Sequence, residues 1–473
     1  GNSQASTGYT IDQSIRFNNP DSAYMSRTPS SAGNRRTFTI SFWIKRGNPA
    51  TSTGQQILNA YQNSSNRFQL FFDASVASGS VGDKLTLFNV SGGTVTSIFE
   101  TTQLFRDHSA WYNFVISIDT TNAIASERVR LYVNGSRVTD FSTQNNPSLN
   151  YDMEWNNNQS HIFGEYGGGA YHLDAYLAEI HNIDGQALDC NSFAEFNDSG
   201  IWIPKEYDGS YGTNGFKIDG RDSSDLGDDE SGQGNDFTTS GLASHDQVSD
   251  SPTNNFAVLN PLDKGSNTTL ANGNIEFTSS NDGGVRSSVF FNADKYYIEA
   301  IVGTYGNAFS FGISNADRSL SADAGTDLAD FYGWYINPTQ NWIASGSNPW
   351  NTGSNSASAS KDVMQMAVDA SDPTSIKLYA GVNNTYYDSS GGTTANPSTG
   401  ANPTATITGG EEWSIGFWNR DASASNIFVN FGQEGTFGGN KTAGGNSDAK
   451  GIGNFFHSVP SGFKALCTKN VGS

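Results

Sequence analysis

Cysteine is nearly absent from this chain of 473 residues, in which only Cys190 and Cys467 occur. The two lie far apart and form no CxxC motif or cluster with histidine, so neither a disulfide scaffold nor a zinc site is predicted. We therefore expect synthesis in a reducing cytoplasm. A run of about 18 apolar residues is missing, which predicts no transmembrane helix and no membrane insertion. A signal-peptide pattern is missing too, and the start at Gly1 rather than methionine leads us to expect further sequence, such as an attachment segment, before it.

Basic residues are few as well, with 26 Lys and Arg against 47 Asp and Glu and a formal net charge of −21. Such a charge opposes binding to phosphate backbones and anionic bilayers, so nucleic acid is not expected as a partner. We interpret the acidity mainly as a source of solubility that prevents self-association. A role at a host surface or with divalent ions is the alternative.

The usual helix formers Leu, Glu, Lys and Met are scarce, whereas Gly (52 residues), Ser, Thr and Asn are abundant. This composition is typical of strands joined by many turns. Aromatic residues make up 12% of the chain and supply large buried surfaces, so aromatic cores are expected. The length exceeds that of one ordinary domain of about 100 to 200 residues. The predicted fold class is all-β, with two jelly-roll-like β-sandwiches joined by a Gly- and Asp-rich connector.

Apolar and polar residues alternate with a period of two in short runs of the first part, which predicts strands. Such runs occupy residues 37–45 (TFTISFWIK), 111–119 (WYNFVISID) and 129–133. The last run enters Asn134-Gly135, a dipeptide suited to a type I′ hairpin. The first sandwich is assigned to residues 1–199, and the connector to residues 200–270. The connector includes the acidic stretch 219–236, which has almost nothing to bury.

A second sandwich is assigned to residues 271–473. Its expected strands are 295–302, 308–313, 362–368, 375–379, 413–418 and 427–431. Residues 344–360 and 388–408 are nearly pure small and polar residues and are expected to form long loops, either functional or mobile.

Several stretches of the first part resemble the laminin-G-like, concanavalin-A-like jelly rolls found in proteins of marine tailed phages. The matching stretches, which together span about residues 9–197, are 14–17 (SIRF), 24–27 (YMSR), 37–45, 111–119, 131–135 (LYVNG) and 176–185 (YLAEIHNIDG). The connector resembles a phage-associated linker at 200–205 (GIWIPK), 211–216 (YGTNGF), 226–237 and 250–260 (DSPTNNFAVLN).

The second sandwich is similar to SPRY-type domains. The stretches that carry this similarity are 296–300 (YYIEA), 311–313, 363–369 (VMQMAVD), 377–383 and 431–433, and residues 460–467 (PSGFKALC) resemble the ending of such phage proteins. The resemblance implies a virion-surface protein that is assembled in the host cytoplasm and contacts other virion proteins. It also favours a homo-oligomer, with a trimer as the preferred state, although no coiled-coil heptad specifies one.

Catalytic signals are missing, so the chain is expected not to be an enzyme. Retaining glycosidases place two carboxylates about 5 to 5.5 Å apart, and no E-x-D-x-E string occurs. Glu179 and Asp184 are five residues apart across a turn, while Asp174 and Glu179 fall on opposite faces of an ideal strand. These acids are interpreted as charges at strand ends. The six histidines show no ligand spacing, and no GxSxG elbow or phosphate-binding loop appears.

Two groups of residues are candidate binding sites. Carboxylates of the acidic stretch could hold calcium, although the EF-hand spacing is missing, and laminin-G-like domains often bind this ion at a rim. These residues are Asp222, Asp225, Asp228 and Asp229. No cofactor is expected to be required, and a solvated loop is the alternative. Aromatic residues at loop edges, with a neighbouring amide, could contact a sugar: Trp342, Trp350, Asn348, Tyr386 and Tyr387. Trp43, Trp111, Trp413 and Trp418 are instead expected in the cores.

The expected function is that of a structural or interaction protein on a tailed-phage virion. A tail-fibre or receptor-binding component would recognise a host surface glycan or protein through its loops. A capsid decoration protein without a receptor role is the first alternative. A glycan-degrading tail enzyme is the second.

Overall fold

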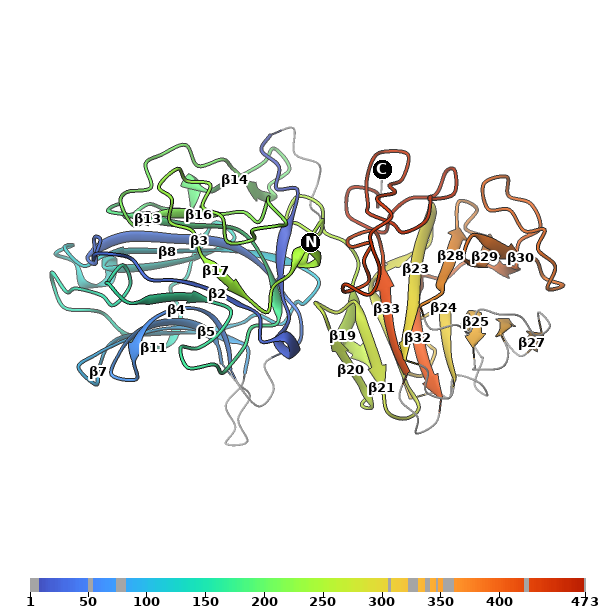
Figure 1. Ribbon diagram of the computed structural model, residues 1–473, viewed down its shortest axis with the longest axis horizontal. Helices are drawn as coiled ribbons and strands as arrows, with labels where there is room; N and C mark the ends of the chain where they lie inside the picture. Colours follow the sequence, from blue (N-terminus) through green and yellow to red (C-terminus); the bar gives the residue numbers. More distant parts are fainter. Residues whose placement is uncertain are drawn as a thin grey trace. The chain divides into compact units, whose positions relative to one another are not determined.

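The computed structural model describes residues 8–49, 54–73, 82–304, 308–321, 331–336, 341–345, 348–351, 361–420 and 425–471, with the backbone alone at 341–345 and 348–351. Nearly all elements in these ranges are strands. The helical elements there are three-residue 3-10 turns, η1 (Asn19–Asp21), η2 (Ala125–Glu127), η3 (Cys190–Ser192) and η4 (Ser244–Asp246). The chain divides into two compact units, Gly1–Asn255 and Phe256–Ser473, each built from β-sheets (Figure 1). The all-β fold class with two sandwiches is confirmed.

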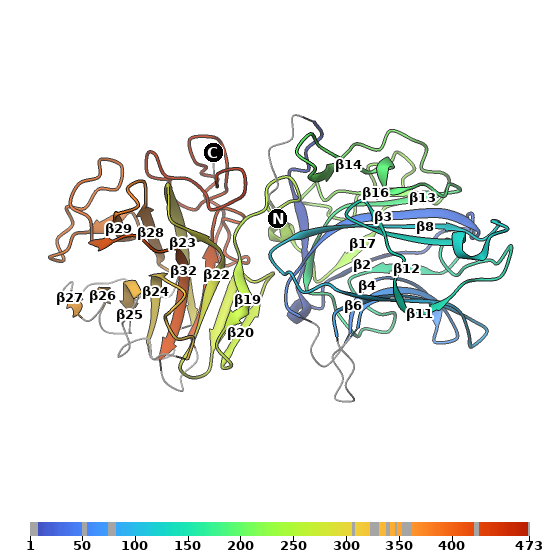
Figure 2. The ribbon, with the colours of Figure 1, turned by 180° about the vertical axis from the view of Figure 1, so that it is seen from behind.

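The first unit contains two large antiparallel sheets, here called the front sheet and the back sheet. The back sheet has the order β10 (Ser136–Arg137), β9 (Val129–Val133), β8 (Trp111–Asp119), β3 (Thr37–Arg46), β13 (Ala175–Asp184), β1 (Ser14–Phe17) and β18 (Gln247–Val248), and β16 (Phe216–Ile218) also pairs with β13. The front sheet has the order β11 (Phe141–Asn145), β7 (Thr94–Leu104), β6 (Lys84–Ser91), β5 (Asn66–Phe72), β4 (Gln55–Asn63), β12 (Ser160–Phe163), β2 (Tyr24–Arg27) and β17 (Thr238–Ser240). Figures 1 and 2 show the first unit from opposite sides, with the back sheet as the upper layer and the front sheet as the lower layer in both views.

The alternation in residues 37–45 becomes the central strand β3, whose Phe38 and Phe42 enter the core between the two sheets. Trp43 points to the opposite face and is buried there too, against Trp111 of β8. Both faces of the back sheet are therefore covered. The front sheet differs, because exposed and half-buried positions recur along β7. Its outer face is thus partly exposed to solvent along β7.

The predicted hairpin after β9 is confirmed. Asn134 and Gly135 both adopt positive φ, 47° and 82°, as a type I′ turn requires, and Ser136 of β10 pairs with Val133. Glycine is needed at the second position because Trp202 lies directly against it.

The structure departs most from the prediction in the expected connector, because residues 200–255 belong to the first unit. Its strand β16 pairs with β13, β17 pairs with β2, and β18 pairs with β1. Phe216 and Phe237 are buried in the core of this unit. A few widely spaced apolar residues suffice to anchor a stretch that is polar on average. The division between the units falls at Asn255 and Phe256 rather than at residues 199 and 271. A small hairpin, β14 (Ala194–Phe196) and β15 (Trp202–Pro204), precedes these strands.

The second unit also contains two antiparallel sheets. One has the order β19 (Leu259–Lys264), β22 (Gly283–Phe291), β32 (Trp413–Arg420), β24 (Ala308–Ser314), β25 (Phe331–Ile336), β26 (Asn341–Ser345) and β27 (Asn348–Asn351). The other has the order β20 (Thr268–Ala271), β21 (Glu276–Ser279), β33 (Ser425–Asn430), β23 (Lys295–Thr304), β28 (Val363–Asp369), β29 (Ser375–Val382) and β30 (Thr385–Tyr387), with β31 (Ala405–Thr408) on β29. Phe311 and Phe417 stack in the core at a centroid distance of 4.8 Å.

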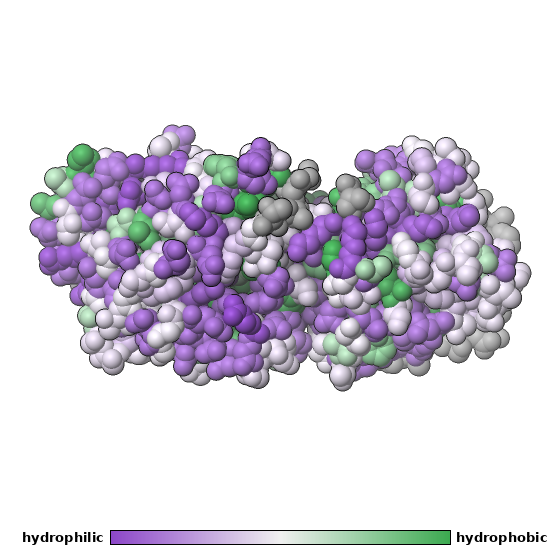
Figure 3. Space-filling model, turned by 90° about the horizontal axis from the view of Figure 1, so that it is seen from above, coloured by the Kyte–Doolittle hydropathy of each residue, from purple (hydrophilic) through white to green (hydrophobic). Residues whose placement is uncertain are grey.

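The four tryptophans expected in the cores, Trp43, Trp111, Trp413 and Trp418, are all buried. On the face drawn in Figure 3, hydrophilic residues predominate and hydrophobic ones form small separate patches. In the described ranges no helix has the length and apolar character needed to cross a membrane.

Candidate functional site

A cavity of about 400 Å³ opens on the outer face of the front sheet. It is lined by Gly54, Gln56, Arg67, Gln69, Phe71, Tyr166 and Tyr171. The residues from β5 are two positions apart and therefore share one face of the strand. Gln56 lies opposite Phe71 in the register of β4 and β5, which brings it to the same face. The two tyrosines come from residues 164–172, the loop between β12 and β13.

The floor of this cavity is a fixed chain of polar side chains. Gln56 donates through Nε2 to the backbone oxygens of Leu58 (2.7 Å) and Leu70 (3.1 Å). Gln69 then donates to Oε1 of Gln56 at 3.0 Å, and Nε of Arg67 donates to Oε1 of Gln69 at 2.8 Å. Because both glutamines are buried, this chain sets the orientation of each amide before any ligand arrives.

The wall of the cavity is aromatic. The ring of Tyr166 meets Tyr61 edge-to-face at 5.1 Å and Tyr171 at 5.9 Å between centroids. Gly167 allows this packing, because a Cβ there would lie 2.2 Å from the ring of Tyr61. Tyr171 has a positive φ of 57° and is 49% exposed, while its backbone oxygen accepts a hydrogen bond from the backbone N–H of Gln56. Left-handed backbone at a bulky residue is costly and tends to gather at functional sites.

Arg67 gives the cavity a positive charge. Its guanidinium lies 5.3 Å from the ring centroid of Phe88, a neighbour on β6, and no carboxylate of the described residues forms an ion pair with it. Burial raises the pKa of Tyr166, and the charge of Arg67 acts in the opposite direction. At neutral pH the tyrosine is therefore an uncharged hydroxyl. Rings that stack, amides that accept and donate, and one cation together suit a polar ring-shaped ligand such as a sugar.

The structure describes only part of the aromatic site that the sequence predicts in the second unit. Trp342 lies in β26, and Asn348 and Trp350 lie in β27, where Trp350 pairs with Ile343 across the hairpin. The side chains of Trp342, Asn348 and Trp350 lie outside the described part of the structure.

Tyr386 and Tyr387 are neighbours in β30 and face opposite sides of the strand. Tyr387 turns inward and meets Trp334 edge-to-face at 5.6 Å, so it is a core residue. Tyr386 accepts a bond from Nε2 of Gln365 at 3.3 Å and lines a second cavity, of about 500 Å³, beneath the loop that contains Pro397. Of this pair, only Tyr386 lines a cavity.

The acidic stretch holds its carboxylates apart. Asp222 accepts bonds from the backbone and hydroxyl of Ser224, and Asp225 from the backbone of Gly227. Asp229 is buried and accepts backbone bonds from Lys217 at 2.8 Å and Asn235 at 2.8 Å. These acids therefore shape turns of the loop.

The fourth acid of the stretch, Asp228, is half-buried. Burial is the largest cause of its raised pKa, and the neighbouring carboxylates raise this pKa further. Among the described residues, no three or more His, Cys, Asp or Glu side chains come together as a metal-binding group. The structure thus does not bring Asp222, Asp225, Asp228 and Asp229 into one ligand set.

Glu179 is not a charge at a strand end, as the sequence suggested, but a buried residue in the middle of β13. It sits at a bulge between Ala178 and His181 with a positive φ of 48°. Its carboxylate lies 3.2 Å from Nε2 of His181 and 3.2 Å from Nζ of Lys217, and it accepts a bond from the hydroxyl of Tyr9. Burial raises its pKa, but these partners outweigh burial and hold the pKa at about 2. The carboxylate is therefore ionised at neutral pH and paired.

The other two acids of that group also have structural partners. Asp184 accepts bonds from the backbone nitrogens of Asn34 (2.7 Å) and Asn214 (3.0 Å). Asp174 accepts one from the Asn48 amide at 2.8 Å, and burial raises its pKa to about 6. Asp174, Glu179 and Asp184 thus each fasten a different loop.

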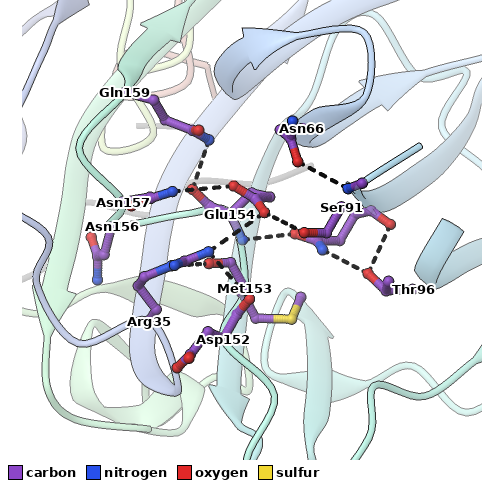
Figure 4. Close-up of polar contacts among 12 residues, drawn as sticks. Arg35, Asn66, Ser91, Thr96, Asp152, Met153, Glu154, Asn156, Asn157 and Gln159 are labelled. Carbon is purple, nitrogen blue, oxygen red and sulfur yellow. Dashed lines mark hydrogen bonds and ion pairs between the residues drawn. The ribbon is translucent and has the colours of Figure 1, made fainter. Parts of the chain in front are cut away.

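A further buried carboxylate, Glu154, forms the centre of the network in Figure 4. Ser91 donates to its Oε1 at 2.8 Å, Asn157 donates to its Oε2 at 3.3 Å, and Arg35 lies 3.5 Å away. Gln159 donates to its backbone oxygen at 2.9 Å. These contacts tie the loop before β12 to the β6–β7 hairpin, which is an anchoring role.

Sequence reasoning missed the cavity on the front sheet. Its polar floor residues alternate with core residues in β5, a pattern that is equally typical of a solvated strand face. The available signal was the loop 164–172 (GEYGGGAYH), in which three glycines are flanked by two tyrosines.

Comparison with known proteins agrees with the fold. Residues 19–187 match the family described as the concanavalin A-like lectin/glucanases superfamily. No curated protein matches the chain. The class that the fold defines is therefore an all-β protein with a laminin-G-like, concanavalin-A-like jelly roll in its first unit.

Similar solved structures share little sequence with this chain. Mouse laminin alpha1 domains LG4-5 are 10% identical, with 98% of this chain and 89% of that chain covered and a TM-score of 0.30. The SAP-like pentraxin from Limulus polyphemus is 16% identical, with 38% and 78% covered and a TM-score of 0.28. The SPRY domain of human HERC1 is 12% identical, with 36% and 96% covered and a TM-score of 0.26. Likenesses at these TM-scores do not bear on function.

Proposed function

We propose that this chain is a non-enzymatic interaction protein on the surface of a tailed-phage virion, of tail-fibre or receptor-binding type. In this proposal the cavity on the front sheet binds a host surface glycan. The observation that carries the binding role is the preformed cavity itself, with tyrosines at its wall and fixed amides on its floor. The virion setting is supported by the sequence resemblance, above all by the stretches between residues 200 and 260.

The dimensions of the cavity suit a small polar ligand. Sites for such ligands measure about 300 to 1,000 Å³ and combine apolar walls with a few fixed polar groups. Tyr171 is half exposed and can stack on the apolar face of a sugar ring, while Gln69 and Arg67 meet hydroxyl oxygens. Little of this arrangement must reorganise on binding, which favours affinity.

The residues that line the cavity support the non-enzymatic part of the proposal. Glycoside hydrolysis uses an acid and a second carboxylate about 5 to 10 Å apart across the scissile bond. The described residues that line the cavity offer amides, tyrosines and an arginine in those places. Such a site holds a glycan without cleaving it, and it requires no cofactor. Homotrimers that contact other virion proteins would multiply a weak single-site affinity.

The test uses the full-length protein and a panel of surface polysaccharides purified from marine bacteria. Calorimetric titration should detect binding of at least one polysaccharide, and Tyr171→Ala should weaken it about tenfold through the loss of stacking. Leu149→Ala is the control, because Leu149 is equally exposed and does not line the cavity.

Three outcomes would contradict the proposal. If Tyr171→Ala leaves glycan binding unchanged, the glycan does not bind in this cavity. If the protein releases reducing ends from the polysaccharide, it is a glycan-degrading enzyme rather than a binding protein. Labelled protein that stains no bacterial cell but binds capsids would favour a decoration role instead.

A further inference from the structure

Arg67 is held in the cavity in a manner that leaves one edge of its guanidinium free. Its Nε donates to Gln69 at 2.8 Å, and its plane lies over the ring of Phe88 at 5.3 Å. Among the described residues neither terminal nitrogen has a hydrogen-bond or ion-pair partner. The two terminal amino groups therefore form a free fork on a residue that lines the cavity.

This arrangement differs from that of most other arginines in the same unit. Arg46 is bonded through a terminal nitrogen to Asp83, Arg36 through Nε to Asp152, and Arg137 through NH1 to Glu127. In a chain with a net charge of −21, acidic partners are plentiful. An arginine that is fixed in place by an amide and a ring, yet has no acid beside it, is available to an acid from outside.

The free edge suits an acid that presents two oxygens side by side. Two parallel N–H groups of a guanidinium match the two oxygens of a carboxylate, and the pair is about twice as strong as a neutral hydrogen bond. Because the bond to Gln69 and the contact with Phe88 already restrict the side chain, binding costs little rotamer entropy. The tyrosine wall meanwhile requires a ring next to the anionic group.

We propose that the cavity recognises an acidic sugar, a ring that carries a carboxylate, and that Arg67 binds this carboxylate through its two terminal nitrogens. This inference rests on the proposed glycan binding and deepens it. Tyr166 and Tyr171 contact the ring, and Gln69 holds Arg67 in the orientation that presents the fork. Arg67 is thus the residue that sets specificity, whereas the tyrosines supply affinity for sugars in general.

The test compares three probes by calorimetric titration of the full-length protein. They are a uronic-acid oligosaccharide, the same oligosaccharide with its carboxylates reduced to alcohols, and a sulfated neutral oligosaccharide of equal length. The wild-type protein should bind the uronic-acid probe at least about tenfold more tightly than the reduced one, as expected for one bidentate pair. The sulfated probe should bind more weakly than the uronic-acid probe, because a sulfate ester spreads its charge over three oxygens and is a weaker hydrogen-bond acceptor than a carboxylate.

The variants separate specificity from folding. Arg67→Gln should abolish the preference for the acidic probe, so that the acidic and reduced probes bind with affinities within about twofold of each other. Arg67→Lys should keep part of the preference, because a point charge replaces the fork. Arg137→Gln is the control, since Arg137 is an arginine of the same unit that pairs with Glu127 away from the cavity, and it should bind as wild type does. Unchanged unfolding midpoints establish that each variant is folded.

Equal affinity of the wild type for the acidic and reduced probes would overturn the inference and leave glycan binding intact. A preference for the acidic probe that survives in Arg67→Gln would likewise overturn it. Tighter binding of the sulfated probe would overturn the assignment to a carboxylate. If neither the acidic nor the reduced probe binds although another polysaccharide does, the inference fails alone, whereas failure of every glycan removes the proposed function as well.

Discussion

Nζ of Lys45 and Oδ2 of Asp250 lie 2.7 Å apart, and both side chains are completely buried. Asp250 also accepts bonds from Nε1 of Trp111 (3.2 Å) on its other carboxylate oxygen and from Ser14 (2.6 Å) on its backbone oxygen. The pair joins the central strand β3 to a residue 205 positions later in the chain. The segment expected to be a connector is therefore fastened to the first unit by a buried charge pair.

Breaking this pair should destabilise the protein strongly. Asp250→Ala leaves Lys45 as a buried cation without its carboxylate, which typically costs about 3 to 5 kcal/mol. The free energy of unfolding from urea titration of the full-length protein measures the loss. Asp152→Ala, which removes an exposed pair with Arg36, is the control and should cost less than about 1 kcal/mol. Equal effects of the two substitutions would contradict the structural role of Asp250.

The first unit should fold as a fragment of residues 1–255 but not as one of residues 1–199. The shorter fragment loses β16 and β17 from the sheets and removes Phe216 and Phe237 from the core. Large apolar surfaces on both sheets would then meet water. Size-exclusion chromatography and thermal unfolding should find a monodisperse, cooperatively unfolding longer fragment and an aggregated shorter one. A stable fragment of residues 1–199 would restore the connector interpretation.

Glu299 of β23 should make the stability of the second unit depend on pH. Its buried carboxylate accepts bonds from the backbone nitrogens of Phe456 (2.8 Å) and His457 (2.8 Å) and from the hydroxyl of Tyr297 (2.9 Å). Burial raises its pKa from 4.5 to about 7, against these bonds. The folded state thus retains a proton that the unfolded state releases, so the stabilisation is complete below about pH 4.5 and is lost as pH rises to about 7.

The measurement is the difference in unfolding free energy between the wild type and Glu299→Gln. This difference should shift against the wild type by about 2 to 3 kcal/mol from about pH 5 to about pH 8. Because the amide group of glutamine places N–H donors where Glu299 has an oxygen that accepts from a backbone N–H, the variant should be less stable at the acidic end of the range. A difference that is constant with pH would show that Glu299 keeps the same charge in the folded and unfolded states.

Much of the architecture could be predicted because it depends on local patterns. The alternation around Phe42 specifies a strand with one face in the core, and Asn134-Gly135 specifies a tight hairpin. The connector could not be read in this manner. The burial of Asp250 depends on Lys45, a partner more than 200 positions away, and nothing in the local sequence distinguishes it from a solvated acid.

The cavity on the front sheet could not be predicted for the same reason, since it depends on contacts between residues that are distant in the sequence. Gln56 and Gln69 look like solvent-facing residues of two strands until the register of β4 and β5 brings them together. The tyrosines reach the cavity only because the loop between β12 and β13 folds back over this face. The predicted Tyr386 lines a cavity as a loop-edge aromatic should, whereas its neighbour Tyr387 is used by the core. Alternation within a strand separates two such residues, but it does not say which face is inside.

Gly167 should control the wall of the cavity through steric exclusion alone. In Gly167→Ala the new Cβ would lie 2.2 Å from the Tyr61 ring, so either that ring or the loop that carries Tyr166 and Tyr171 must move. Because the cavity is preformed, such a shift should weaken glycan binding by about tenfold or more in calorimetric titration. Gly169→Ala is the matched control in the same loop. Gly169 has a φ of 79° and no atom within 4 Å of its Cβ position, so this variant adds backbone strain of about 1 kcal/mol without a clash. If both variants bind alike, the placement of the tyrosine wall does not determine affinity.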